Sequence, residues 1–191
     1  MDRRERLRQL IMDLAVVHGR VRLASGKTAE YYVDLRRVTL HHVAAPLVGD
    51  LMLDMLSQAG LGPGPVAAVG GLTLGADPVA AAVMHAAARR GLELDAFVVR
   101  KGAKGHGLQR RVEGPDVAGR PVVVVEDTST TGGSVLSAVE AVRQAGAEVK
   151  GVAVVVDRAT GARELIEDSG LAYHALFGLA DLGLASAKPP Q

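Results

Sequence analysis

The stretch of residues 121–134, which reads PVVVVEDTSTTGGS, constrains the fold more than any other part of the chain. Four consecutive valines after a proline are typical of a strand that is buried on both faces, as in a parallel sheet. The run ends at an acidic pair, Glu126 and Asp127, and a helical pattern of apolar residues follows over residues 135–146. The sequence therefore predicts a strand, a short loop and a helix, the repeating unit of a doubly wound α/β fold.

The loop between that strand and that helix is suited to binding an anion. Residues 128–134 contain five hydroxyl side chains and two glycines. Glycines let backbone N–H groups approach a phosphate, and a helix N-terminus carries roughly half a positive charge. Because Glu126 and Asp127 would repel a phosphate alone, we expect a ligand that also carries hydroxyl groups, such as a ribose 5-phosphate. The alternative is an ordinary strand-to-helix turn with Asp127 as a local cap.

Composition excludes several classes of protein. A chain of 191 residues is long enough for one domain with a sizeable core. Lysine plus arginine number 22 and aspartate plus glutamate 21, so bulk charge gives no reason to expect nucleic acid or anionic membrane. The absence of cysteine excludes disulfides, thiolate metal sites and cysteine nucleophiles. Without a long apolar run or a signal-peptide pattern, the expected location is the cytoplasm.

Hydrophobic periodicity elsewhere predicts helices that alternate with short strands. We expect helices over residues 3–18, 41–60, 77–90 and 163–168, the third beginning with Asp77 as its cap. We expect the other strands over residues 21–24, 31–35, 66–69, 96–99, 148–156 and 171–176, with Gly70 and Gly71 closing the third. Residues 101–120 lack periodicity, which is typical of a lid or binding loop or of a disordered segment. The expected fold is a mostly parallel central sheet flanked by helices, with ligands beyond the carboxyl ends of the strands.

A basic segment directly follows the strand expected at residues 96–99. Arg100, Lys101, Lys104 and His106 place three fixed positive charges and one imidazole within seven residues. Such a loop is often solvated surface, but one that closes over a site would neutralise a departing diphosphate and exclude water.

These motifs resemble those of a known family. VVVVEDTSTTGGS is similar to the phosphoribosyl-diphosphate (PRPP) signature of the type I phosphoribosyltransferases, and R-K-x-x-K-x-H at 100–106 resembles the catalytic loop of one subfamily, the orotate phosphoribosyltransferases. The resemblance implies the type I phosphoribosyltransferase fold as a single domain, 1–191, with a small N-terminal hood near residues 19–36 and a flexible catalytic loop near 101–120. It implies Mg-dependent transfer of the phosphoribosyl group from PRPP to orotate. The products would be orotidine 5′-monophosphate and diphosphate, in de novo pyrimidine (UMP) biosynthesis.

The resemblance also implies roles for individual residues. Catalysis would depend on Lys104, His106 and Asp127. PRPP would contact the basic loop and the central motif, namely Arg100, Lys101, Lys104, His106, Glu126, Asp127, Thr128, Ser129, Thr130, Thr131, Gly132, Gly133 and Ser134. Orotate would contact Thr130, Arg158, Tyr32 and Lys27. Magnesium would be held mainly by PRPP without direct protein ligands, and the catalytic loop would complete the site of the opposite subunit in a homodimer. No nucleic-acid or membrane partner is implied.

Two positions depart from the family pattern, and three alternatives stay open. Ala24 and the segment 74–76 stand where other members carry a lysine, and Lys27 is a candidate substitute for the first. A purine or uracil salvage transferase would share the phosphate loop, and so would a PRPP-sensing regulatory protein of the same fold, which would need a nucleic-acid surface. Arg158, whose guanidinium could fork onto the carboxylate of orotate, could instead form a surface salt bridge.

Overall fold

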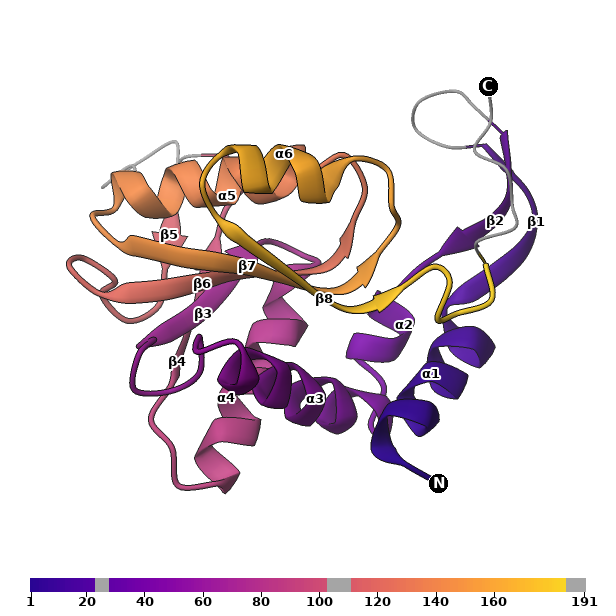
Figure 1. The fold of residues 1–191 in the computed structure, drawn as a ribbon, viewed down its shortest axis with the longest axis horizontal. Helices are drawn as coiled ribbons and strands as arrows, with labels where there is room; N and C mark the ends of the chain where they lie inside the picture. Colours follow the sequence, from indigo (N-terminus) through magenta and orange to yellow (C-terminus); the bar gives the residue numbers. More distant parts are fainter. Residues whose placement is uncertain (23–27, 103–110, 185–191) are drawn as a thin grey trace.

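A computed structural model describes residues 1–22, 28–102 and 111–184, and these ranges contain two sheets (Figure 1). The larger sheet has six strands in the order β5-β4-β3-β6-β7-β8. They are β3 (Ala68–Leu72), β4 (Asp95–Val99), β5 (Val112–Glu113), β6 (Pro121–Ser129), β7 (Glu148–Asp157) and β8 (Ala172–Gly178). All neighbours pair in parallel except β4 and β5, which are antiparallel. The predicted, mostly parallel α/β sheet is confirmed.

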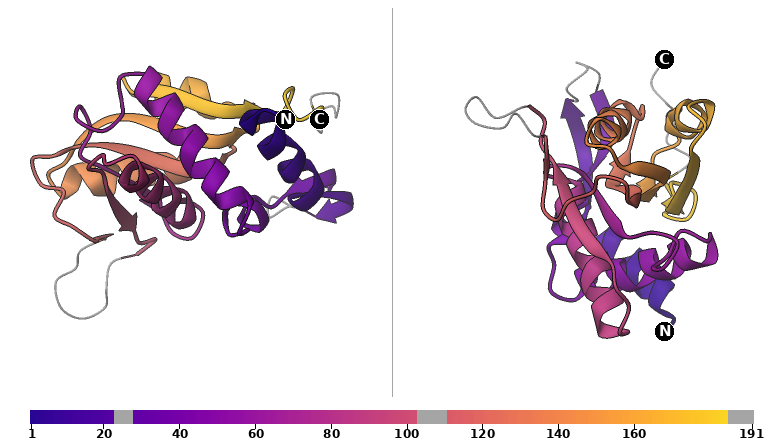
Figure 2. Two further views of the ribbon diagram at one scale, coloured as in Figure 1. Left: turned by 90° about the horizontal axis from the view of Figure 1, so that it is seen from below. Right: turned by 90° about the vertical axis from the view of Figure 1, so that its left-hand side faces the viewer.

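Helices cover both faces of this sheet (Figures 1 and 2). One face packs against α3 and α4, and the opposite face packs against α5 and α6. The helices are α1 (Arg3–Leu14), α2 (Arg36–Thr39), α3 (Ala44–Gln58), α4 (Ala76–Arg89), α5 (Gly133–Gln144) and α6 (Ala162–Asp168). Among the residues that the structure describes, no helix is long and apolar enough to cross a membrane.

The valines of β6 explain why this strand is central. Val122 and Val124 pack toward α5 and α6, whereas Val123 and Val125 pack toward α3 and α4. All four are at most 1% exposed. Because side chains alternate along a strand, a continuous valine run supplies apolar contacts to both helical layers at once.

The smaller sheet is a hairpin at one end of the molecule (Figure 1). Its strands, β1 (Val16–Arg22) and β2 (Thr28–Val33), pair antiparallel, with Val16 opposite Val33. This hairpin covers most of the segment near residues 19–36 for which a hood was predicted. Ala24 and Lys27, which the sequence singled out, lie outside the described residues.

Several predicted boundaries are wrong, and in each case pairing with a distant segment decides. The first helix ends at Leu14 rather than near residue 18, because β1 begins at Val16 and pairs with β2. The short strand β5 lies within the segment 101–120 that was predicted to be loop, since it pairs with β4. The helix predicted over 41–60 runs from Ala44 to Gln58, and the short helix α2 precedes it without having been predicted.

Two further boundaries concern strands that lead to the candidate site. β3 continues through Gly70 and Gly71 to Leu72, instead of ending before them. A Cβ atom at either glycine would lie 2.2 Å or less from a backbone oxygen of a neighbouring strand, so the glycines allow close strand packing. β6 continues through the acidic pair to Ser129. Finally, α4 has Gly75 at its N-cap, so Asp77 lies in the first turn and is not the cap.

The crossing of α3 and α4 leads to a prediction about stability. A Cβ atom at Gly49 of α3 would lie 2.2 Å from the backbone oxygen of Ala82 in α4. Gly49→Ala should therefore force the helices apart and lower the free energy of unfolding by about 1–3 kcal/mol, despite the higher helix propensity of alanine. Urea unfolding measures this. Gly102→Ala is the matched control, because a Cβ atom there meets nothing within 4 Å; equal stability of the two variants would contradict the prediction.

Candidate active site

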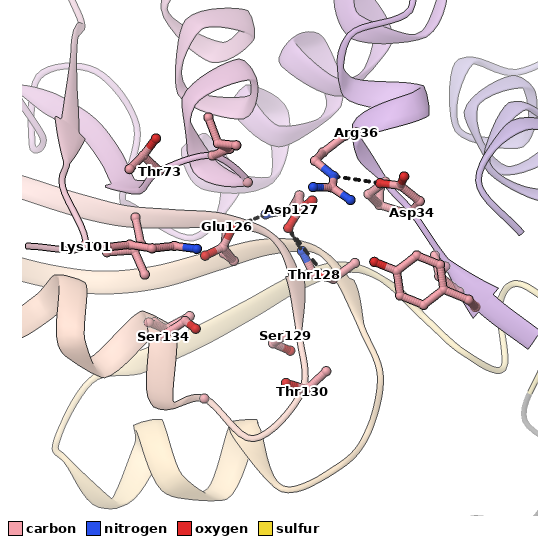
Figure 3. Close-up of a pocket in the computed structure, with 18 residues that line it drawn as sticks. Asp34, Arg36, Thr73, Lys101, Glu126, Asp127, Thr128, Ser129, Thr130 and Ser134 are labelled. Atoms are coloured by element: carbon pink, nitrogen blue, oxygen red, sulfur yellow. Dashed lines mark hydrogen bonds and ion pairs between the residues drawn. The ribbon is translucent and has the colours of Figure 1, made fainter. Parts of the chain in front are cut away.

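A cavity of about 580 Å³ lies beyond the carboxyl ends of β3 and β6 (Figure 3). Four segments line it: residues 32–36 from β2 and the start of α2, residues 72–75 after β3, Lys101, and most of residues 126–135. This is the edge of the sheet where the sequence predicted ligand binding.

The acidic pair is buried beside this cavity. Glu126 and Asp127 are 7% and 9% exposed. The backbone N–H of Asp127 donates to Glu126 Oε1 at 3.0 Å, and the backbone N–H of Thr128 donates to Asp127 Oδ1 at 2.6 Å. The Thr128 hydroxyl also donates to Asp127 Oδ1, at 3.3 Å. Backbone groups of β6 therefore fix one oxygen of each carboxylate.

The turn between β3 and α4 lies directly against these two carboxylates. A Cβ atom at Gly75 would lie 2.3 Å from Glu126 Oε1 and 2.7 Å from Asp127 Oδ1. Any side chain at this position would displace the pair. Thr73 stands in the same turn, and its hydroxyl donates to Asp77 Oδ2 at 2.8 Å.

Burial is the main cause of an unusual ionisation at Glu126. It raises the pKa of Glu126 to about 8, and the charges of Asp127 and Asp77 add to the increase. The hydrogen bond from the Asp127 backbone N–H opposes this shift without cancelling it. At neutral pH the Glu126 carboxyl is therefore mostly protonated, which lowers the negative charge beside the cavity.

The hydroxyl-rich loop leads into α5 as predicted. Gly132 is the N-cap residue of α5 and has a positive φ of 83°. This backbone conformation favours glycine and turns the chain so that the helix N-terminus lies beside the cavity. Asp127 lies inside β6 and is not a cap of α5, so the alternative of a simple capped turn is wrong.

Two cationic side chains line the cavity from different segments (Figure 3). Lys101, predicted from the basic loop, points toward Glu126. Arg36 comes from α2, and its Nε donates to Asp34 Oδ1 at 2.8 Å. That hydrogen bond is the largest cause of a raised pKa at Arg36, and the charge of Asp127 also contributes.

Sequence reasoning missed Asp34, Arg36, Thr73 and Gly75 as site residues. The first two belong to a segment that the resemblance marked as hood, but polar residues after a strand are common and gave no separate signal. The other two enter the cavity only because β3 and β6 are neighbours in the sheet.

Other predicted residues are not gathered at the cavity wall. Of the described residues, Arg100, Thr131, Gly133 and Arg158 are outside the lining. Arg158 follows β7 directly, and its backbone N–H donates to the backbone carbonyl oxygen of Ser129 at 3.2 Å. Arg158 is therefore adjacent to the start of the hydroxyl-rich loop. Lys104, His106 and Lys27 lie outside the described residues.

The ionisation of Glu126 leads to a prediction about pH. In the unfolded chain this carboxyl titrates near 4.5, whereas in the folded protein it titrates near 8. The folded state binds more protons in this window, so the free energy of unfolding should fall as the pH rises through it. Glu126→Gln keeps the shape of the protonated acid and should remove this loss, which is on the order of 3 kcal/mol.

Urea unfolding at about pH 5 and about pH 9 measures this difference. The matched control is Glu140→Gln, which changes an exposed carboxylate on α5 and should keep the wild-type pH dependence. An identical pH dependence in the wild type and Glu126→Gln would contradict the prediction.

Comparisons with known proteins agree with this geometry. The phosphoribosyl transferase domain family matches residues 65–169. The orotate phosphoribosyltransferase of Streptomyces avermitilis is 64% identical over 184 residues, which cover 96% of this chain and 98% of that protein. The crystal structure of the Mycobacterium tuberculosis orotate phosphoribosyltransferase with Fe(III) dicitrate superposes with a TM-score of 0.85 at 58% identity, covering 96% of this chain and 100% of that one.

The Mycobacterium tuberculosis enzyme has also been crystallised with PRPP. That structure superposes with a TM-score of 0.82 at 54% identity, again covering 96% of this chain and 100% of that one. The predicted type I phosphoribosyltransferase fold is confirmed, and this chain belongs to the orotate phosphoribosyltransferases.

Proposed function

We propose that this protein transfers the phosphoribosyl group of PRPP to orotate, giving orotidine 5′-monophosphate and diphosphate in de novo pyrimidine biosynthesis. The observation that carries this function is the buried acidic pair beside a hydroxyl-rich loop at the N-terminus of α5. The relatives named orotate phosphoribosyltransferase, at 60–64% identity over nearly the whole chain, support the same activity.

The arrangement of charges suggests how PRPP is oriented. The loop of residues 130–134 and the α5 N-terminus offer hydroxyl and N–H donors to the 5-phosphate, whereas the hydroxyls of Thr128 and Ser129 already donate to Asp127 and Asp157. The ribose hydroxyls then donate to Asp127, whose position is fixed by β6. The diphosphate extends toward the basic segment that begins with Arg100 and Lys101, and the same segment carries Lys104 and His106.

The proposed reaction is a displacement at C1 of the ribosyl group. The C1–O bond breaks with its electron pair leaving on diphosphate, and orotate N1 forms the new N–C1 bond while its proton passes to the departing diphosphate. Positive charge develops on the ribosyl ring, so the Asp127 carboxylate beside the ribose stabilises it. Lys104 and His106 neutralise the departing diphosphate, and the fixed positions of both reactants supply much of the remaining rate.

Base selection is assigned to Thr130 and Arg158. The orotate carboxylate distinguishes this base from uracil, and a guanidinium binds a carboxylate through two parallel hydrogen bonds. Tyr32 lines the same cavity and is a candidate contact for the pyrimidine ring.

The atoms around the cavity that could coordinate a metal ion are compatible with magnesium that enters with PRPP. They are oxygen atoms, which magnesium prefers, and in this proposal diphosphate and ribose oxygens would hold the ion. Asp127 is the carboxylate best placed to assist. Within the described ranges, no three Asp, Glu or His side chains gather to hold a metal. When bound, magnesium would neutralise charge on the leaving diphosphate.

One assay tests the function. The protein is incubated with magnesium, PRPP and either orotate, uracil, adenine or guanine, and the loss of each base is followed by ultraviolet absorbance. We expect consumption of orotate alone. Asp127→Asn keeps the shape of the side chain but removes its charge. The resulting decrease in kcat/KM for orotate should correspond to a loss of about 2–4 kcal/mol of transition-state stabilisation.

The other outcomes identify the alternatives. Consumption of uracil or a purine in preference to orotate would favour a salvage transferase. Tight PRPP binding with no base consumed would favour a PRPP-sensing regulatory protein. A near-normal kcat/KM in Asp127→Asn would show that Asp127 does not hold the ribose.

The second prediction concerns the homodimer that we propose from the family resemblance, in which the catalytic loop of each subunit completes the site of the other. Lys104→Ala and Asp127→Asn should each be nearly inactive, because every site then contains one defect. In a mixture that has been dissociated and reassociated, about half the dimers are hybrids, and one of the two sites in each hybrid has neither change. Activity should recover to about a quarter of the wild-type value.

The same mixture distinguishes the opposite arrangement. A loop that closes over its own site would leave one defect in every site, and mixing would restore no activity. Size-exclusion chromatography before and after mixing is the control for reassociation.

A further inference from the structure

The turn after β7, residues 157–160, is fixed to the loop after β6 by several hydrogen bonds. The Arg158 backbone N–H donates to the backbone carbonyl oxygen of Ser129 at 3.2 Å, and the Thr160 hydroxyl donates to the backbone carbonyl oxygen of Thr130 at 2.5 Å. Ser129 and Asp157 are also direct partners in the register of β6 and β7. The turn that carries Arg158 therefore has a defined position relative to Thr130.

Three buried polar side chains, those of Tyr173, Ser129 and Asp157, form a chain of hydrogen bonds that ends at this turn. Asp157 Oδ1 accepts from the Ser129 hydroxyl at 3.2 Å and from the Ala159 backbone N–H at 2.9 Å. The Ser129 hydroxyl is also hydrogen-bonded to the Tyr173 hydroxyl of β8. Because Ser129 uses its only proton toward a carboxylate, Tyr173 is the donor in the second bond.

The members of this chain are removed from solvent. Ser129, Tyr173 and Asp157 are 1%, 4% and 9% exposed. Burial is the largest cause that raises the pKa of Tyr173 to about 12, so its hydroxyl keeps its proton at every physiological pH. Buried hydrogen bonds of this kind are costly to break, because a donor or acceptor is left without a partner.

The backbone of this turn contains one uncommon conformation, at Ala159. Ala159 has a φ of 51°, a left-handed conformation that is uncommon for a residue with a side chain. The hydrogen bond from its N–H to Asp157 Oδ1 closes a turn over Arg158 and so restrains the backbone of Arg158.

We propose that Tyr173, Ser129 and Asp157 are positioning residues, which act through Arg158 to set the affinity for the carboxylate of the base. This inference rests on the proposed function, in which Arg158 binds that carboxylate. None of the three residues needs to touch the base. The hydrogen bonds run from Tyr173 in β8 through Ser129 in β6 to Asp157 in β7, so a change at Tyr173 can reach the turn that carries Arg158.

The test compares Tyr173→Phe, Arg158→Ala and the double variant. Tyr173→Phe removes one hydroxyl and should raise the KM for orotate about threefold to tenfold, with the KM for PRPP unchanged. Arg158→Ala should raise the KM for orotate at least thirtyfold, on the scale of a charged bidentate pair. In the Arg158→Ala background, Tyr173→Phe should have almost no further effect, since coupled residues are not additive.

Controls separate positioning from general destabilisation. Ser169→Ala also removes one hydroxyl hydrogen bond, to the Ile166 oxygen at the end of α6, and should leave both KM values unchanged. Melting temperatures of all variants show the loss of stability by itself. If Tyr173→Phe does not fold, Asp157→Asn, which weakens the two hydrogen bonds accepted by Asp157 Oδ1, takes its place in the cycle.

Each result supports or overturns a specific claim. A normal KM for orotate in Arg158→Ala would refute the proposed role of Arg158 and this inference with it. A large effect of Arg158→Ala with no effect of Tyr173→Phe would refute the inference alone. An equal factor for Tyr173→Phe in both backgrounds, or an equal change in the KM for PRPP, would mean that Tyr173 is only structural.

Discussion

The structure depends on two carboxylates that are buried within β6, directly after its run of four valines. Placing Glu126 and Asp127 there costs free energy, because charged groups lose their hydration. Backbone N–H groups of β6 offset part of the cost, and the raised pKa of Glu126 removes one of the two charges at neutral pH. The neighbouring turn must then come close without a side chain, which explains the glycine at position 75. Valine run, acidic pair and glycine turn are thus one arrangement, in which the hydrophobic strand holds a polar site.

What the sequence could predict was local along the chain. The strand, loop and α5 are contiguous, so valine burial, the two glycines and the helical period could be read without knowledge of the partners. Boundaries that depend on pairing between distant segments could not be predicted. β1 replaces the end of the first helix because β2 lies beside it, and β5 exists because β4 offers a free edge. The same reason explains why Arg36, which comes from another segment, was missed at the site.

The family pattern and the cavity differ in how they supply positive charge. Leu74, which is 67% exposed, stands in the turn where the family resemblance implies a lysine in some members, so this turn brings backbone and the hydroxyl of Thr73 to the cavity. Arg36 and Lys101 are the cations among the described lining residues, and they approach from two different elements. A cavity whose charges come from separate elements can be read only after the fold is known, although each residue is plain in the sequence.

The extension of β6 beyond the acidic pair explains how the proposed ribose and base sites are placed relative to each other. Had the strand ended at Glu126, the ribose site and the base site would lie on a loop that could move between them. Instead β6 pairs with β7 as far as Ser129 and Asp157, so the carboxylates and the turn carrying Arg158 are attached to the same two strands. Sites on strands hold their geometry better than sites on loops, and a displacement reaction depends on the distance between its reactants. The sheet thus fixes both halves of the proposed site.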